Sequence, residues 1–183
     1  MRRSLAKWIF YDLWGWKIIG DFPHHFPKYI IAVAPHTSAW DLIVGLLVRE
    51  VTGLKTGFIG KDSLFRGPFG WLFRALGGHP VDRSKSNNFV QSAVDLFKSK
   101  EKLVIALAPE GTRERVDRLR TGFYYIALGA GIPILPATID FSKKEVRIYP
   151  WFYPTGDENA DMEHILQYFR GSSGKIPERS VFF

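Results

Sequence analysis

The 183-residue sequence contains no cysteine. This absence excludes disulfide bonds, a thiolate nucleophile and cysteine-type zinc sites, and it fits a reducing compartment. Internal repeats, low-complexity tracts and linkers of altered composition are missing too, so we predict a single domain covering residues 1–183. Hydrophobic residues make up 46% of the chain, which is enough for a substantial core.

Long uninterrupted apolar runs are also lacking. The longest uncharged run, 121–139, contains three glycines and two prolines that divide it into a helix followed by a strand. Segment 1–16 has a basic tip, but Lys7 and Asp12 interrupt its apolar stretch and no small-residue cleavage site follows. We therefore predict neither a transmembrane span nor a signal peptide.

Basic residues outnumber acidic ones. The 25 Lys and Arg against 18 Asp and Glu give a formal charge of +7, and 15% of the residues are aromatic. This combination favours an anionic partner, because nucleic acid and an anionic membrane surface both attract Lys and Arg and both accommodate aromatic rings. Charge alone does not separate these two partners.

Two apolar runs end in nearly the same way. Residues 28–35 (KYIIAVAP) precede His36, and residues 102–109 (KLVIALAP) precede Glu110. A continuous aliphatic run that ends at proline is typical of a strand buried on both faces, and open α/β sheets place their chemistry beyond the carboxyl ends of such strands. The polar residues after both runs are therefore candidates for a functional site.

Helices and strands alternate along the chain. This order predicts an α/β fold in which helices flank a mostly parallel central sheet. The expected segments are an N-terminal amphipathic region (1–27), a motif-bearing core (28–140) and a C-terminal strand and helix (141–183). The periodicities predict helices near 3–13, 40–51, 68–76, 89–97, 121–129 and 161–169, and strands near 29–34, 57–60, 80–82, 103–108, 134–139 and 145–149.

His36 and Asp41 form the first candidate pair. On one helix their side chains would point about 140° apart, so they meet only if His36 lies in a loop and Asp41 in the first turn of the next helix. The carboxylate would then fix the imidazole tautomer and leave Nε2 able to accept a proton, as in the general-base half of a triad. The alternative is structural: Ser38 at the N-cap and Asp41 at N3 resemble a capping box.

The second candidate site follows the second apolar run. In Pro109-Glu110-Gly111-Thr112-Arg113, the glycine lets the backbone approach a ligand and the guanidinium can grip a phosphate with two parallel hydrogen bonds. Arg83 could supply another cation, although Asp82 and Arg83 alone suggest a surface turn. Three arginines further along could simply form a solvated face: Arg115, Arg118 and Arg120.

Together, in this order and spacing, these elements resemble the phospholipid/glycerol acyltransferase family, which includes the 1-acylglycerol-3-phosphate acyltransferases. The His36 and Asp41 pair matches the first family motif, and Val81-Asp82-Arg83 matches the second. Residues 109–113 match the third and residues 132–136 (IPILP) the fourth. The resemblance covers residues 28–140 and implies a glycerol-phosphate acyltransferase-like fold.

The resemblance also implies a reaction. The family transfers an acyl group from acyl-CoA or acyl carrier protein to the hydroxyl of a lysophospholipid acceptor, 1-acylglycerol-3-phosphate first among them, without metal or other cofactor. His36 would deprotonate the hydroxyl and Asp41 would orient His36. Arg83 and Arg113 would hold the acceptor phosphate, and Pro133 would shape the acyl side. Three more residues would complete the phosphate pocket: Glu110, Gly111 and Thr112.

Some positions depart from the family pattern. Glu114 stands where serine is common, and Arg120-Thr121-Gly122 stands in place of Lys-x-Gly. The second motif begins with Gly-His-Pro-Val at 78–81, where Gly-x-Ile or Gly-x-Phe is commoner. A different lipid acceptor, such as a lyso-aminolipid or a hydroxylated pigment, therefore stays an alternative. A basic nucleic-acid-binding protein is a further alternative, but it leaves the motifs unexplained, so no nucleic acid is expected as a partner. A hydrolase is disfavoured because the sequence has no Gly-x-Ser-x-Gly elbow.

Two segments are suited to a bilayer interface. Leu5, Trp8, Ile9, Leu13 and Trp16 fall near one helical face beside basic residues, and segment 64–76 (LFRGPFGWLFRAL) repeats this composition. Such faces bind anionic membranes reversibly, although ordinary core packing would explain them as well. Together with the family resemblance, they predict a cytoplasmic protein that is peripheral on the inner face of the cell membrane.

Overall fold

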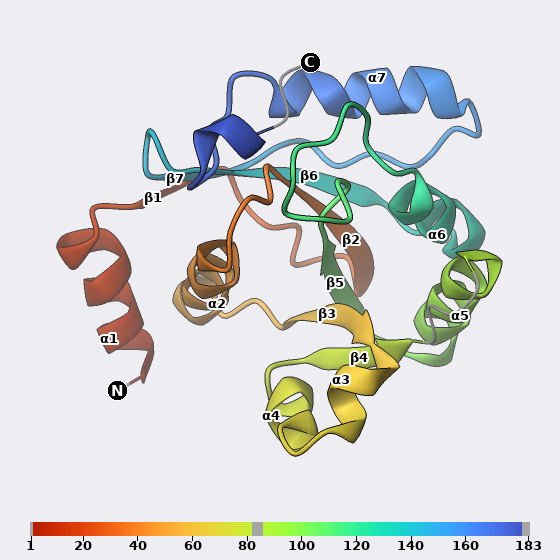
Figure 1. Cartoon of the computed structure of the whole chain (residues 1–183), viewed down its shortest axis with the longest axis horizontal. Helices are drawn as coiled ribbons and strands as arrows, with labels where there is room; N and C mark the ends of the chain where they lie inside the picture. Colours follow the sequence, from red (N-terminus) through yellow and green to blue (C-terminus); the bar gives the residue numbers. More distant parts are fainter. Residues whose placement is uncertain (1, 82–85, 181–183) are drawn as a thin grey trace.

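A computed structural model describes residues 2–81 and 86–180. In these residues a seven-stranded sheet has helices on both faces (Figure 1), with strand order β1-β7-β6-β2-β5-β3-β4. Every neighbouring pair is parallel except β6 and β7, which are antiparallel. The predicted α/β fold with a mostly parallel sheet is confirmed.

Most elements lie where the periodicities predicted them. The strands are β1 (Lys17–Ile19), β2 (Lys28–Ala34), β3 (Thr56–Lys61), β4 (Gly78–Val81), β5 (Leu103–Leu107), β6 (Ile134–Asp140) and β7 (Glu145–Ile148). The helices are α1 (Arg2–Lys7), α2 (Trp40–Thr52), α3 (Asp62–Arg66), α4 (Gly70–Ala75), α5 (Ser86–Ser99), α6 (Gly122–Ala130) and α7 (Glu158–Phe169), with a π-helix η1 (Trp8–Leu13) and a 3-10 helix η2 (Pro177–Arg179).

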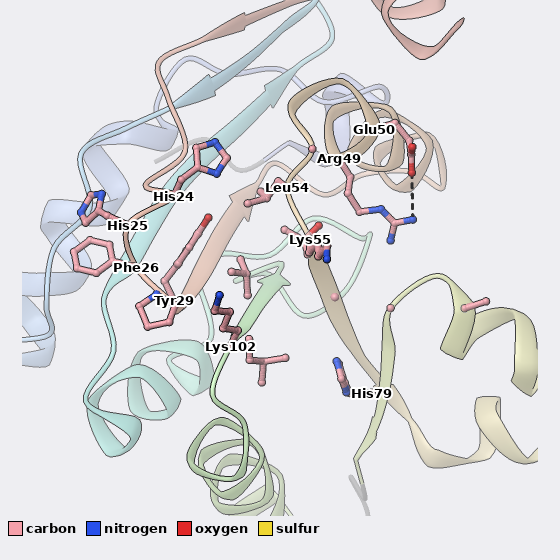
Figure 2. Close-up of a pocket in the computed structure, with 18 of the residues that line it drawn as sticks. His24, His25, Phe26, Tyr29, Arg49, Glu50, Leu54, Lys55, His79 and Lys102 are labelled. Atoms are coloured by element: carbon pink, nitrogen blue, oxygen red, sulfur yellow. Dashed lines mark ion pairs between the residues drawn. The ribbon is translucent and has the colours of Figure 1, made fainter. Parts of the chain in front are cut away.

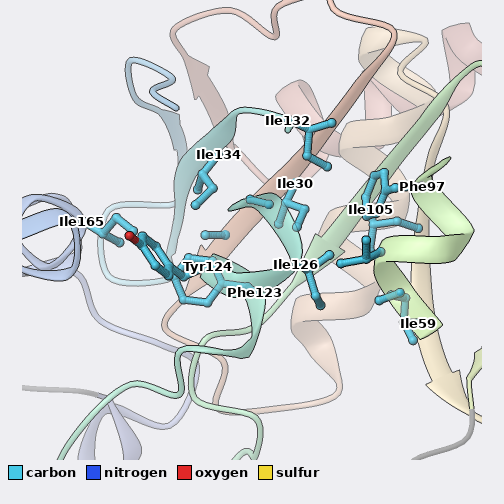
Figure 3. Packing of buried hydrophobic residues seen from close by; sticks show 14 of the residues in the cluster. Ile30, Ile59, Phe97, Ile105, Phe123, Tyr124, Ile126, Ile132, Ile134 and Ile165 are labelled. Carbon is cyan, nitrogen blue, oxygen red and sulfur yellow. The ribbon is translucent and has the colours of Figure 1, made fainter. Parts of the chain in front are cut away.

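Alternation along β2 divides the core into two layers. Ile30 belongs to the cluster that packs against α5, α6 and α7, and Figure 3 shows it gathered with Tyr124 and Ile126 of α6. Tyr29 and Ile31 belong to the other cluster, which packs against α1, η1 and α2. Successive strand side chains point to opposite faces, so both faces of this central strand are buried by helices.

The N-terminal helix differs from the prediction. A single α-helix was expected over 3–13, but the chain is α-helical only to Lys7 and continues as the π-helix η1. Ala6 and Phe10 point into the core and Trp16 is buried, whereas Trp8 and Leu13 are more than half exposed. Part of the predicted apolar face therefore remains on the surface, and Trp16 belongs to the core.

The two central strands carry the predicted site to one edge of the sheet. β2 and β5 are parallel neighbours, with Lys28 opposite Leu103 and Ala32 opposite Leu107. Both strands end at the same edge, so the loop that begins at Pro35 and the loop that begins at Ala108 lie side by side. We call the end of the sheet where these parallel strands finish the carboxyl edge, and the end where they begin the amino edge.

Candidate functional site

The carboxyl edge brings His36 and Asp41 together. His36 Nδ1 lies 2.9 Å from Asp41 Oδ2, and the side chains are 27% and 5% exposed. An Nδ1–H donated to the carboxylate leaves the Nε2 lone pair as the basic position of the imidazole. Nε2 has no hydrogen-bond partner in the described part of the chain, and His36 lines a cavity.

The backbone of the loop fixes the Asp41 carboxylate. Its Oδ2 accepts hydrogen bonds from Thr37 N and Ser38 N, both at 2.9 Å. The hydrogen bonds of the alternative capping box are present as well, because Ser38 Oγ accepts from Trp40 N and Asp41 Oδ2 accepts from Ser38 N, although Ala39 directly precedes α2. Asp41 therefore holds the loop with the same oxygen that contacts the imidazole.

Glu110 closes the loop from the neighbouring strand. Its Oε1 accepts a hydrogen bond from His36 N at 2.8 Å, across 74 positions in the sequence. The side chain is 1% exposed, and burial raises the pKa of its carboxyl, opposed by the hydrogen bond from His36. Glu110 thus positions the backbone of His36 rather than its ring.

The C-terminal segment packs on the same loop. Thr37 is fully buried, and its Oγ1 accepts a hydrogen bond from Ile176 N at 3.2 Å. A Cβ on Gly174 would lie 2.4 Å from that oxygen, so only glycine allows this approach. Arg179 Nη1 also lies 3.1 Å from Glu114 Oε1. Sequence reasoning missed Thr37, because a threonine inside a motif gives no sign of a partner 139 residues away.

Gly111 shapes the loop that follows Glu110. It has φ +65°, in the left-handed region that favours glycine, and a Cβ there would lie 2.7 Å from Arg120 Cδ. Arg120 therefore lies across the glycine, and Arg120 N donates to Pro109 O. Arg118 and Arg120 line the cavity beside Arg113, although the sequence also allowed them to be a solvated face.

The cavity beside His36 has a volume of about 1800 Å³. Part of its wall is cationic, formed by Arg113, Arg118 and Arg120, for which no ion pair occurs in the described residues. Four carboxylates line other parts of the cavity: Glu114, Asp117, Glu158 and Glu163. Much of the remaining wall is apolar: Ile59, Phe89, Val90, Leu107, Val116, Leu119, Phe123, Met162 and Leu166. The site therefore offers an anion-binding region and an apolar region next to one basic nitrogen.

The remaining predicted residues fall in different places. Thr112 lines the cavity, and its Oγ1 accepts a hydrogen bond from Glu114 N. Pro133 does not line it: Pro133 precedes β6, which runs parallel to β2, so it lies at the amino edge, where its oxygen accepts from Ile30 N. Its predicted place on the acyl side stays a prediction. Arg83 lies outside the described residues.

The residues that the structure describes contain no cluster of three or more His, Asp or Glu side chains suited to a metal ion.

The family model described as Acyltransferase matches residues 21–140. This match covers more than half of the chain and includes His36, Asp41 and the whole 109–113 loop. The chain belongs to this acyltransferase family.

Several curated relatives are named 1-acyl-sn-glycerol-3-phosphate acyltransferase. The one from Salmonella typhimurium is 30% identical over 125 residues, which are 64% of this chain and 49% of the relative. The one from Haemophilus influenzae is 28% identical over 159 residues, covering 80% of this chain and 64% of the relative. The chain thus spans about half to two thirds of these relatives' lengths.

A solved structure supports the fold. The crystal structure of the 1-acyl-sn-glycerophosphate (LPA) acyltransferase PlsC from Thermotoga maritima matches with a TM-score of 0.57. The match covers 91% of this chain and 74% of that chain, at 19% sequence identity. At this identity the likeness establishes a shared fold.

Proposed function

We propose that this protein is an O-acyltransferase that moves a fatty acyl group from a thioester donor to the hydroxyl of a lysophospholipid. The observation that carries the proposal is the His36 imidazole, held by Asp41 on Nδ1, in a cavity with cationic and apolar walls. The names of the relatives support 1-acylglycerol-3-phosphate as the acceptor.

The reaction needs one base. His36 Nε2 accepts the proton of the acceptor hydroxyl as its oxygen attacks the thioester carbonyl carbon, and Asp41 stabilises the imidazolium that forms. The tetrahedral intermediate collapses with cleavage of the carbon–sulfur bond, and the thiolate takes up the proton held by His36. The products are an ester and a free thiol. General-base assistance of this kind contributes about 10²- to 10⁴-fold in rate.

The two walls suit the two parts of the substrates. Arg113 and Arg120 can hold an acceptor phosphate by charge-assisted hydrogen bonds, and the apolar wall can take a fatty acyl chain. The donor is acyl-CoA or acyl carrier protein, since both present the acyl group as a thioester.

One observation favours a different acceptor. Glu114 lines the cavity, where its carboxylate is half of an ion pair with Arg179. A carboxylate at this position attracts a cationic headgroup and opposes a phosphate. The second candidate is therefore the same acyl transfer to a lyso-aminolipid.

Reversible membrane binding would bring both lipids to the site. Among the described helices, none has the length and apolar character needed to cross a bilayer. Exposed apolar side chains instead gather near α1, at the start of α2 and on α4: Leu5, Trp8, Leu13, Trp40, Ile43, Phe69 and Trp71. Such side chains beside basic residues bind anionic surfaces, so we propose a peripheral location on the inner face of the cell membrane.

The test is acyl transfer by the purified protein. Lysophosphatidic acid is supplied with long-chain acyl-CoA or acyl carrier protein, and both free thiol and the diacyl product are measured. We expect both products from wild type and a loss of at least about 100-fold in His36→Ala. His164→Ala is the matched control, because His164 is exposed on α7 and does not line the cavity. No turnover with any donor, or full activity of His36→Ala, would reject the proposal.

The acceptor is tested separately. Lysophosphatidic acid and a lyso-aminolipid are compared at equal donor concentration in wild type and Glu114→Ser. Preference for lysophosphatidic acid in wild type supports the first acceptor. Preference for the lyso-aminolipid that is lost in Glu114→Ser supports the second.

A further inference from the structure

A second cavity opens at the amino edge, where the parallel strands begin, whereas His36 lies where they finish. It has a volume of about 830 Å³ and is lined by the starts of β2, β3 and β5 together with residues from α1, α2 and segment 24–27. Figure 2 shows its side chains, which come from widely separated parts of the sequence. Neither the predicted reaction nor the family motifs use this cavity.

The cavity is strongly basic. Arg3, Arg49, Lys55 and Lys102 line it, and Glu50 is the one carboxylate among the described lining residues. The guanidinium groups are anchored to the backbone, since Arg3 Nε donates to Val51 O and Arg49 Nη1 donates to Leu76 O. Arg49 also forms an ion pair with Glu50, at 3.8 Å from Nη2 to Oε1.

The two lysines are not held in this way. Lys55 and Lys102 are exposed, and the described residues supply no hydrogen bond or ion pair to either ammonium. Fixed positive charge is thus combined with two ammonium groups that can turn toward a bound anion.

Tyr29 adds a buried donor. The residue is 1% exposed and lines the cavity, yet its hydroxyl has no hydrogen-bond partner in the described structure. Burial raises the pKa of Tyr29 to about 12, so the phenol stays protonated. An unpaired buried hydroxyl is unfavourable, and a ligand oxygen would satisfy it.

We propose that the amino-edge cavity binds a phosphate-bearing small molecule. Phosphate oxygens would accept from Lys55, Lys102 and the Tyr29 hydroxyl, within the positive field of the two anchored arginines. The volume is that of a small-molecule site. His25 and Phe26 form an aromatic wall, with ring centroids 4.2 Å apart, on which a nucleobase can stack. The phosphate could be inorganic or belong to a nucleotide.

Histidine NMR reports on this cavity directly. Of the five histidines in the chain, His24, His25 and His79 line the amino-edge cavity, whereas His36 lies at the carboxyl edge and His164 on α7. Pyrophosphate and ADP are titrated separately into Arg113→Ala/Arg120→Ala protein, which removes two cations from the other cavity.

We expect saturable shifts of the His24, His25 and His79 resonances without matching shifts of His36 and His164. Lys55→Glu/Lys102→Glu should raise the dissociation constant at least about tenfold. Tyr29→Phe should raise it less. Lys17→Glu is the control, because Lys17 is exposed on β1 and lines neither cavity.

Tighter binding of ADP than of pyrophosphate would assign the site to a nucleotide, and the reverse order to inorganic phosphate. The proposal is overturned if neither probe shifts the three resonances, or if Lys17→Glu weakens binding as much as the double variant. The experiment uses no acyl donor or acceptor, so its result is independent of acyl transfer.

Discussion

The two edges of the sheet differ in the polar groups that they hold and in those that they leave without a partner. At the carboxyl edge, Asp41 accepts two backbone N–H groups besides contacting His36, and Glu110 accepts a third. In the described residues, the buried atoms without a partner are the acceptors Asp41 Oδ1 and Glu110 Oε2 at the carboxyl edge and the Tyr29 hydroxyl, a donor, at the amino edge. Fixed geometry suits chemistry at one atom, whereas unsatisfied donors suit reversible binding of an anion.

The largest effect should come from breaking the fixed pair. Asp41→Asn removes the charge that stabilises the imidazolium and the acceptor that selects the Nδ1–H tautomer, so we expect kcat to fall about 100-fold or more. Steady-state thiol release measures it. Asp95→Asn, on the exposed face of α5, is the control. A kcat within twofold of wild type would mean that Asp41 only closes the loop.

Thr37 tests whether the carboxyl edge depends on its distant contact. Thr37→Val keeps the side-chain volume but leaves Ile176 N without its acceptor, which costs about 1–2 kcal/mol. We expect a lower Tm and a kcat about tenfold lower with KM little changed, whereas Thr37→Ser should restore both. If both variants keep the wild-type kcat, the C-terminal segment does not position the loop.

The exposed tryptophans test which surface meets lipid. Trp8→Ala and Trp71→Ala should each weaken binding to vesicles of equimolar phosphatidylcholine and phosphatidylglycerol about fivefold, because each removes a large exposed ring. Trp151→Ala is the matched control: Trp151 is also exposed, but it packs beside Phe26 near the amino-edge cavity. Equal losses in all three variants would argue against binding through the two predicted segments. Cosedimentation gives the affinities.

The smallest effect should come from replacing Glu110, and it concerns how the folding stability changes with pH. Burial raises its pKa in the folded state, so between its unfolded and folded pKa values the folded state holds more protons and stability falls as pH rises. Glu110→Gln keeps an acceptor for His36 N and should remove this component. Urea unfolding across the acidic range measures it, with exposed Glu101→Gln as control. The idea fails if Glu110→Gln retains the wild-type pH dependence.

Much of the fold was predictable because its signals are local. The runs that form β2 and β5 are continuous and aliphatic, and their boundaries were predicted to within a residue or two. β1 is an outer strand of the sheet and has only three residues, which are too few for a periodic pattern. The π-helix and α3 were also missed, since neither has a distinct local signal.

The site was predictable in its residue types but not in its contacts. Asp41 lies close to His36 in sequence, so its approach to the ring followed from one bend. The contact of Glu110 with His36 N and that of Thr37 with Ile176 N depend on how distant segments pack. The position of Pro133 shows the same limit, because only the parallel pairing of β6 with β2 reveals that it lies at the amino edge.

A double-mutant cycle tests the central claim, that His36 and Asp41 act together on one proton. The kcat for acyl transfer is measured in wild type, His36→Ala, Asp41→Asn and the double variant. If Asp41 acts through His36, Asp41→Asn should lower kcat strongly in wild type and by less than about twofold in His36→Ala. Full additivity of the two losses would contradict the account.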